Sequence, residues 1–323
     1  DYVLARLTGE VGLSDSSNAL KTGYDLERRC WGAWIERDLG IPLSLLPRVA
    51  TPGDPVAAVS AEGAAQTGVR AGTTVAAGAT DGTAAFFASG AVAPGEWNST
   101  LGTTLVVRGV SRERIHDPLG RIYCHLHPEG AWLPGGASNT GGEWMQQAFP
   151  GADWSELDRE ALALSPTPLT VYPLARVGER LPFVNHRAEG FVEGPEGLAE
   201  GAVYAAHLEG TACVERWIFE VMQSLGCPVG ERIYVTGGGA RSWPWLQIRA
   251  DMLQRVLVRP EAAESAFGAA LLAASHTLYR TLSEATRAMV REARQVEPRP
   301  GFGPAYDALY ARFREACARR GLG

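Results

Sequence analysis

Apolar residues between positions 198 and 225 recur every three or four residues. They stand at Val203, Ala206, Gly210, Val214, Trp217, Val221 and Leu225. This spacing places them along one side of a helix. The pattern therefore predicts a long amphipathic helix that packs one face inward.

A different pattern covers residues 99–136, where short runs of β-branched and aromatic residues alternate with glycine-containing turns. The runs are 99–110, 121–127 and 130–136. Such runs are typical of strands, and short connections favour antiparallel pairing. We predict an antiparallel meander, followed by a helix that begins within residues 138–149.

Three segments have the order strand, glycine-containing turn, helix: residues 72–92, 231–253 and 255–275. A further helix is expected within residues 30–40, closed by Gly40. Strands that alternate with helices indicate an α/β architecture.

Pro94 and Gly95 interrupt the helix that precedes them and suggest a hinge. The expected organisation is a first lobe over residues 1–95, a second lobe over 96–281, and a peripheral helical hairpin over 282–323. The chain starts with Asp1 and not Met, so we expect it to begin within a longer protein or at an artificial boundary.

The composition is that of a globular protein, with 323 residues, 46% hydrophobic and 20% charged. A formal net charge of -6 provides no broad basic surface, so neither nucleic acid nor an anionic membrane is the expected partner. No apolar run reaches the roughly 20 residues that span a bilayer, and no signal peptide opens the chain. A small-molecule partner is expected.

The five cysteines are scattered and contain no CxxC pair, which favours a reducing compartment, the cytoplasm. Lys21 is the only lysine. A P-loop lysine or a Schiff-base lysine is therefore not expected, and a bound phosphate would need backbone N–H groups, arginine or a metal.

Three glycine-containing turns could present backbone N–H groups to an anion. They are Gly102–Thr104, the "NTGGEW" turn around Gly141, and Gly237–Ser242. Each alone is more often a plain turn, but three in one lobe favour the phosphates of a nucleotide. Trp245 either flanks a purine or belongs to the core, and both interpretations stay open.

Asp81 follows a strand-like run and opens a helix of small residues. Local rules favour a helix cap, because an aspartate there accepts a hydrogen bond from an unpaired N–H group. The alternative is a general base that takes the proton of an attacking hydroxyl.

Three other candidates also have two interpretations. Glu179 and Arg180 could form a structural ion pair or belong to a solvated turn. His125 and His127 could supply half of a zinc site, although no second ligand pair has suitable spacing. Glu209 is expected to be a buried, hydrogen-bonded carboxylate or a surface charge.

The order of these motifs resembles the FGGY family of carbohydrate kinases. The resemblance runs along the whole chain, through "LTGE", "LLPRV", "AGATDGTAAFFASGAVAPG", "LGTT", "GGASNTGG", "GERLP", "TGGGARSWPWLQIRADML" and "AFGAALLA". Within the family, "STLGTTLVVRG" and "VYPLARVGERLPF" look most like the D-ribulokinase branch, with the xylulokinases next.

This resemblance implies a two-lobed, actin-like or ribonuclease H-like ATPase fold whose first lobe is incomplete. It implies transfer of the γ-phosphoryl group of ATP, with Mg²⁺, to a hydroxyl of a ketopentose such as D-ribulose or D-xylulose. Asp81 matches the catalytic base that contacts the sugar. The residues that match the ATP site, or lie in its glycine turns, are Gly102, Thr103, Thr104, Gly141, Gly238, Gly239, Ser242 and Trp245.

The chain also departs from the family pattern. Ser242 stands where many members have asparagine, and Gly194 and Pro195 replace a more apolar signature. No D-x-G-T phosphate turn precedes residues 1–10, so roughly a third of a usual member is expected to be absent. A non-catalytic nucleotide-binding module and an actin-like regulatory ATPase are the alternative functions, and a homodimer is left open.

Overall fold

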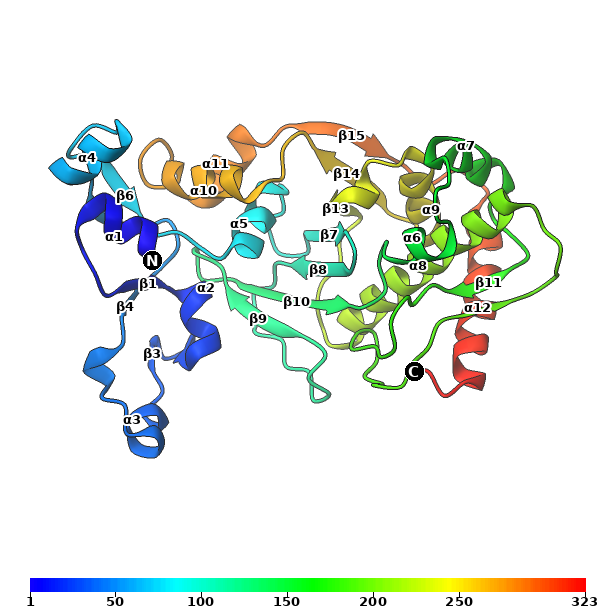
Figure 1. Ribbon diagram of the computed structural model, residues 1–323, viewed down its shortest axis with the longest axis horizontal. Helices are drawn as coiled ribbons and strands as arrows, with labels where there is room; N and C mark the ends of the chain where they lie inside the picture. The colour runs from blue at the N-terminus through cyan, green and yellow to red at the C-terminus, as the bar shows by residue number, and fades with distance from the viewer. The chain divides into compact units, whose positions relative to one another are not determined.

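The computed structural model describes residues 1–323, which form two compact units (Figure 1). Unit 1 contains Asp1–Ala93, His125–Leu133 and Ala262–Arg291. Unit 2 contains Pro94–Cys124, Pro134–Glu261 and Glu292–Gly323. The chain thus passes between the units more than once, and two segments from the later part of the sequence group with unit 1.

Unit 1 is built from short helices and paired strands. Its elements are α1 (Tyr2–Thr8), β1 (Leu13–Asp15), α2 (Ser16–Ala19), β2 (Tyr24–Asp25), β3 (Cys30–Trp31), α3 (Trp34–Leu39), β4 (Arg48–Ala50), β5 (Pro55–Ala58), α4 (Ala61–Thr67), β6 (Thr74–Ala76), α5 (Asp81–Ala88), α10 (Ser265–Ala274) and α11 (Leu282–Met289). The strands form three separate pairs, β1 with β4, β2 with β3, and β5 with β6. Residues 1–95 therefore contain no large sheet. As predicted, α3 ends at Gly40, which has a φ of 66°.

Helices α5 and α10 pack side by side in unit 1. The two helices approach closely at Gly268, where an added Cβ would collide with the backbone of Ala84. The small residues of both helices are therefore explained by close packing, because only a glycine at position 268 leaves room for the neighbouring backbone.

Unit 2 is organised around a seven-stranded sheet with helices packed on it. Its elements are β7 (Trp97–Leu101), β8 (Leu105–Gly109), β9 (Tyr123–Leu126), β10 (Trp132–Ser138), α6 (Trp144–Ala148), α7 (Trp154–Leu164), β11 (Thr170–Tyr172), β12 (Phe191–Glu193), α8 (Glu200–Ser224), β13 (Arg232–Thr236), α9 (Trp243–Leu253), β14 (Val256–Pro260), β15 (Glu292–Val296) and α12 (Gly303–Arg319); β9 and β10 run across the division between the units.

The strand order in this sheet is β15-β14-β13-β7-β8-β10-β9. Strands β7, β13 and β14 are mutually parallel, and β8 runs antiparallel to β7. The predicted meander is wrong in one respect, because β10 and not β9 pairs with β8. Periodicity within a strand cannot show which of two later strands becomes its neighbour.

Helix α8 confirms the predicted long helix but not the single buried face. Most of its residues are buried, including His207, Glu209 and Glu215. The reason is that α7, α9, β11 and α12 all pack against it. Its sequence looks amphipathic because these polar residues lie in the core, where they find partners.

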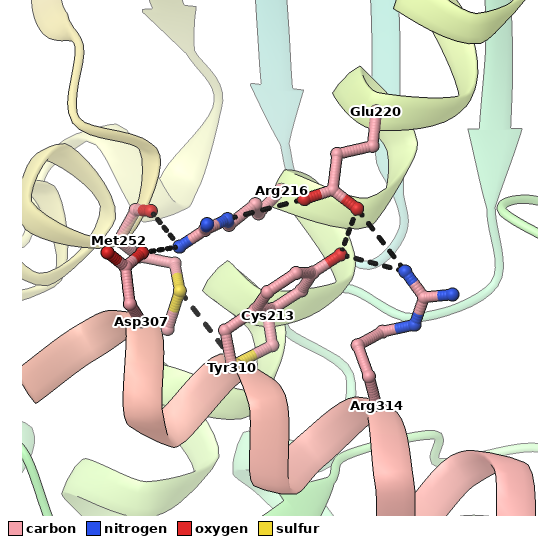
Figure 2. A network of polar contacts seen from close by, with 7 residues as sticks. All are labelled: Cys213, Arg216, Glu220, Met252, Asp307, Tyr310 and Arg314. Atoms are coloured by element: carbon pink, nitrogen blue, oxygen red, sulfur yellow. Dashed lines mark hydrogen bonds and ion pairs between the residues drawn. The ribbon is translucent and has the colours of Figure 1, made fainter. Parts of the chain in front are cut away.

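The predicted helical hairpin at residues 282–323 is also wrong in part. After α11 the chain forms β15, which pairs antiparallel with β14. Helix α12 then lies against α8, where Figure 2 shows the polar network of Cys213, Arg216, Glu220, Met252, Asp307, Tyr310 and Arg314. Arg216 Nη1 lies 2.7 Å from Asp307 Oδ1. The hydroxyl of Tyr310 donates to Glu220 at 2.6 Å.

All five cysteines are free thiols. None of the helices has the length and apolar character needed to cross a membrane.

Candidate functional site

A pocket of about 560 Å³ opens in unit 2. It lies where the parallel strands β7 and β13 end together, with Thr100 opposite Thr236. The glycine turns that follow these two strands line it. In open α/β sheets, ligands bind at the carboxyl ends of the strands, and a volume of ~300–1,000 Å³ is typical of small-molecule sites.

Six of the eight nucleotide-site residues predicted from the sequence line this pocket. They are Gly102, Thr103, Gly238, Gly239, Ser242 and Trp245. Thr103 is exposed, so its hydroxyl and the neighbouring backbone are available to a ligand.

Thr104 and Gly141, the other two, are not among the lining residues. Gly102 donates its N–H to the Thr104 carbonyl at 3.0 Å, which closes the turn. A Cβ on Gly141 would meet the backbone of Thr103 and would lie 2.5 Å from the Thr104 Cα. The next residue, Gly142, donates to the Gly102 carbonyl at 2.8 Å and lines the pocket itself. The two turns are thus packed together as one support.

Glu179 fixes the segment that leads into this support. The residue is 2% exposed, and its carboxylate accepts hydrogen bonds from the Ser138 and Thr140 hydroxyls at 2.8 and 2.9 Å. It also accepts from the Asn139 N–H at 2.7 Å and from the Tyr172 hydroxyl at 3.0 Å. The predicted ion pair with Arg180 does not form. The Arg180 side chain is exposed. Hydroxyl and backbone donors satisfy the buried Glu179 carboxylate, so it needs no arginine partner.

Ser242 and Trp245 each have a structural role as well as a place in the pocket wall. Ser242 is the N-cap of α9, and its hydroxyl accepts the N–H of Trp245 at 3.2 Å. Trp245 is only 2% exposed, and its Nε1 donates to the Leu208 carbonyl at 3.3 Å. The interpretation of Trp245 as a core residue is therefore correct, although the residue also lines the pocket.

The sequence prediction missed another wall of the pocket. Met145, Trp154, Ser155, Asp158 and Tyr204 line it from α6, α7 and α8. Tyr204 donates its hydroxyl to Asp158 Oδ1 at 2.9 Å. The two residues are 46 positions apart, and no local motif links them. Gly142, by contrast, stands beside Gly141 in the same motif and could have been predicted.

A buried ion pair anchors β7 just before the first glycine turn. Arg249 is 0% exposed and donates to both carboxylate oxygens of Glu215, at 2.7 and 2.8 Å. Ser99 joins them, donating to Glu215 Oε1 at 2.5 Å and accepting from Arg249 Nη2 at 3.1 Å. Because Ser99 belongs to β7, this pair ties the strand to α8 and α9.

Asp81 lies in unit 1, as the first residue of α5, and its side chain is exposed. The cap interpretation is wrong, because Thr80 occupies the N-cap position. Asp81 Oδ1 accepts only the N–H of Gly82, at 2.7 Å. An acid in the first helical turn is favoured by the helix dipole, so the carboxylate is held at the helix start and stays accessible.

A buried hydrogen-bond chain positions the start of α5. Asp15 Oδ1 accepts the hydroxyl of Ser17 at 2.5 Å, and Ser17 Oγ accepts the N–H of Thr80 at 2.8 Å. Asp15 and Ser17 are 4% and 3% exposed. The residue before Asp81 is thus fixed through its backbone.

The remaining candidates do not form a catalytic or metal site. No three His, Cys, Asp or Glu side chains lie close enough together to hold a metal ion. His127 is buried, and its Nδ1 accepts the N–H of Glu129 at 3.1 Å. Glu209 is the buried, hydrogen-bonded carboxylate that one interpretation predicted. It accepts from the N–H and the hydroxyl of Thr167, and burial raises its pKa to about 7.

Comparison with protein families supports the family suggested by the motifs. The C-terminal domain model of the FGGY family of carbohydrate kinases matches residues 98–277, and its N-terminal domain model matches residues 1–88. The chain belongs to the FGGY family. The resemblance drawn from the ordered motifs is confirmed, and the actin-like regulatory ATPase is not supported.

Individual FGGY relatives match most of the chain. Xylulose kinase from Bacillus subtilis is 26% identical over 323 residues, which is 96% of this chain and 64% of that protein. Gluconokinase from the same organism is 29% identical and covers 84% of this chain and 56% of its own length. The chain therefore spans less than two thirds of either curated relative.

A solved structure confirms the FGGY fold. The crystal structure of xylulose kinase from Rhodospirillum rubrum superimposes with a TM-score of 0.87 at 29% identity. It covers 99% of this chain and 66% of its own. The predicted α/β, actin-like fold class is thus correct.

Proposed function

We propose that the protein transfers the γ-phosphoryl group of ATP to a hydroxyl of a small sugar, with Asp81 as the general base. The observation that supports this most is the pocket at the ends of β7 and β13, which is lined by Gly102 and Thr103 of one glycine turn and by Gly238 and Gly239 of the other. Membership of the FGGY family supports the reaction class.

The pocket residues would hold the nucleotide without lysine. Gly102, Gly238 and Gly239 carry no side chain that would keep a phosphate from the backbone, and the hydroxyl of Thr103 is exposed beside them. Backbone N–H groups at such turns are effective anion donors. Because phosphoryl transfer depends mainly on positioning and charge stabilisation, a rigid cradle of this kind suits it.

Asp81 would accept the proton of the attacking sugar hydroxyl. Its exposed carboxylate is bound only by the Gly82 N–H, so an oxygen remains free for that proton. The hydrogen bonds from Asp15 through Ser17 to Thr80 limit movement of the helix start. A positioned base of this type contributes roughly 10²–10⁴ in rate.

A ketopentose is the proposed acceptor. Similarity to the xylulose kinases from Bacillus subtilis and Rhodospirillum rubrum supports xylulose as the acceptor. The "STLGTTLVVRG" and "VYPLARVGERLPF" motifs support D-ribulose. The gluconokinase relative is the main competitor. The cytoplasm is the proposed compartment, and a homodimer is retained as the proposed assembly.

Mg²⁺ is assigned to the nucleotide. No group of three suitable side chains exists to hold it alone, and Mg²⁺ in kinases is typically bound by substrate phosphates and one or two carboxylates. When bound, it would neutralise phosphate charge.

The test is a coupled ADP-release assay on the protein in its full encoded length, with D-xylulose, D-ribulose and gluconate. Asp81→Asn should lower sugar-dependent turnover by roughly 10²–10⁴ and leave ADP affinity unchanged. Asp38→Asn, another exposed aspartate of unit 1, is the control and should be fully active.

Full turnover by Asp81→Asn would refute the base assignment. Nucleotide binding without turnover on any sugar would instead support the non-catalytic module.

A further inference from the structure

The nucleotide pocket contains a carboxylate that has no cationic partner. Asp158 lies on α7, lines the pocket and is half-buried. Its only hydrogen bond is the one from Tyr204 to Oδ1, at 2.9 Å. Oδ2 is therefore free to accept a hydrogen bond from a ligand.

The surroundings of Asp158 suit a nucleobase and not a phosphate. A carboxylate repels phosphate groups, whereas the glycine turns of β7 and β13 attract them. The same pocket is lined by Met145 and by Trp154, whose ring centroid is 6.2 Å from that of Tyr204. Flat aromatic and flexible apolar side chains such as these pack well against a planar base.

We propose that Asp158, held in place by Tyr204, selects adenine over guanine by accepting one N–H bond from the 6-amino group at Oδ2. This inference rests on the proposed use of a nucleotide at this pocket. Guanine carries a carbonyl oxygen at the same ring position, which a carboxylate repels. Its N1–H and 2-amino groups would bind a carboxylate best through both oxygens, and the hydrogen bond from Tyr204 competes with guanine for Oδ1.

Tyr204 acts as the positioning residue. It is 1% exposed, so its ring has little freedom to move. Burial and the adjacent Asp158 raise the pKa of its phenol well above the usual value, so the hydroxyl keeps its proton and continues to donate. The Asp158 carboxylate is thereby fixed with Oδ2 available to a ligand in the pocket.

Binding of ADP, IDP and GDP to the protein in its full encoded length, measured by isothermal titration calorimetry, tests this inference. IDP differs from ADP in carrying a 6-carbonyl instead of the 6-amino group. ADP should bind roughly tenfold or more tightly than IDP, since hydrogen bonds to charged groups are among the stronger ones. Equal affinities in the unmodified protein would overturn the inference without any variant.

Asp158→Asn provides a sharper test. The Tyr204 hydroxyl would donate to the amide oxygen of the asparagine, so the amide NH₂ group, a donor, would take the place of Oδ2. ADP affinity should fall by about tenfold, and the ratio of IDP affinity to ADP affinity should rise. Glu156→Gln, an exposed change on the same helix outside the pocket, should alter neither. A parallel loss for both nucleotides would show that Asp158 only supports Tyr204, against the inference.

Tyr204→Phe keeps the buried ring and releases Oδ1. GDP should then gain on ADP, because both carboxylate oxygens become available to guanine. An unchanged ADP-to-GDP ratio would contradict the positioning role. Failure of the unmodified protein to bind any of the three nucleotides would overturn the proposed function itself, which separates the two ideas.

Discussion

Replacing Arg249 with methionine should lower the free energy of unfolding by about 3–5 kcal/mol. Arg249 and Glu215 are 0% and 1% exposed, and the substitution removes both donors that the guanidinium gives to the carboxylate. Ser99 alone would then face a buried negative charge. An isolated ion in the core costs far more than the pair, because the pair's mutual attraction offsets most of its desolvation.

Thermal unfolding followed by circular dichroism and urea denaturation measure this effect. For domains of about 150–250 residues, 1 kcal/mol corresponds to ~2–4 °C, so a decrease in Tm of about 6–20 °C is expected. Arg37→Met serves as the control. Its partner Asp38 is 2.6 Å away on the surface, where solvent screens the pair, and no measurable change in Tm is expected.

The double variant Arg249→Met with Glu215→Leu distinguishes loss of the pair from loss of packing. Removing both charges should recover most of the stability, because apolar side chains of similar volume can replace a buried pair. The explanation fails if the double variant is as unstable as the single one, or if Arg249→Met costs less than about 1 kcal/mol.

Two further predictions concern the support of the pocket and the pH dependence of stability. Gly141→Ala should lower both Tm and ADP affinity, because its Cβ would push the backbone of the Thr103–Thr104 turn aside. Gly238→Ala is the control, because nothing lies near an added Cβ there, and it should leave Tm unchanged. Equal Tm values for the two variants would contradict this account. Burial raises the pKa of Glu209 to about 7, so the folded state keeps a proton that the unfolded state, with an ordinary carboxyl pKa, already loses at lower pH. Stability should therefore fall by up to about 1.4 kcal/mol per pH unit as the pH rises from the ordinary carboxyl pKa to about 7. Glu209→Gln should flatten this decline in urea unfolding between pH 5 and 8, and an unchanged slope would show that another group causes it.

Local sequence patterns predicted the elements whose partners are close in sequence or whose turns need glycine. The turns after β7 and β13 follow strands with clear composition, and Gly102 and Gly238 were identified for that reason. Helix α8 was identified from its period. Its burial on all sides was not, because residues such as Glu215 find their partners far away in the chain.

The missed features all depend on distant pairings. Asp158 and Tyr204 meet only because α7 packs on α8. The sequence leaves Glu179 between an ion pair with Arg180 and a solvated turn, yet most of its hydrogen-bond partners come from residues 138–140 and from Tyr172. Strand β15 is mostly exposed and polar, so its sequence has no strand-like alternation, and its pairing with β14 comes from the tertiary structure.

The assignment of residues 262–291 to unit 1 has a practical consequence for anyone who divides the gene. A fragment cut at Pro94 would carry α10 without α5 and would expose Leu271 and Leu272, which are 0% and 1% exposed in the intact chain. Bare apolar helices of this kind promote aggregation. Neither unit can be excised as one continuous stretch, so co-expressed fragments are the appropriate design for studying either unit.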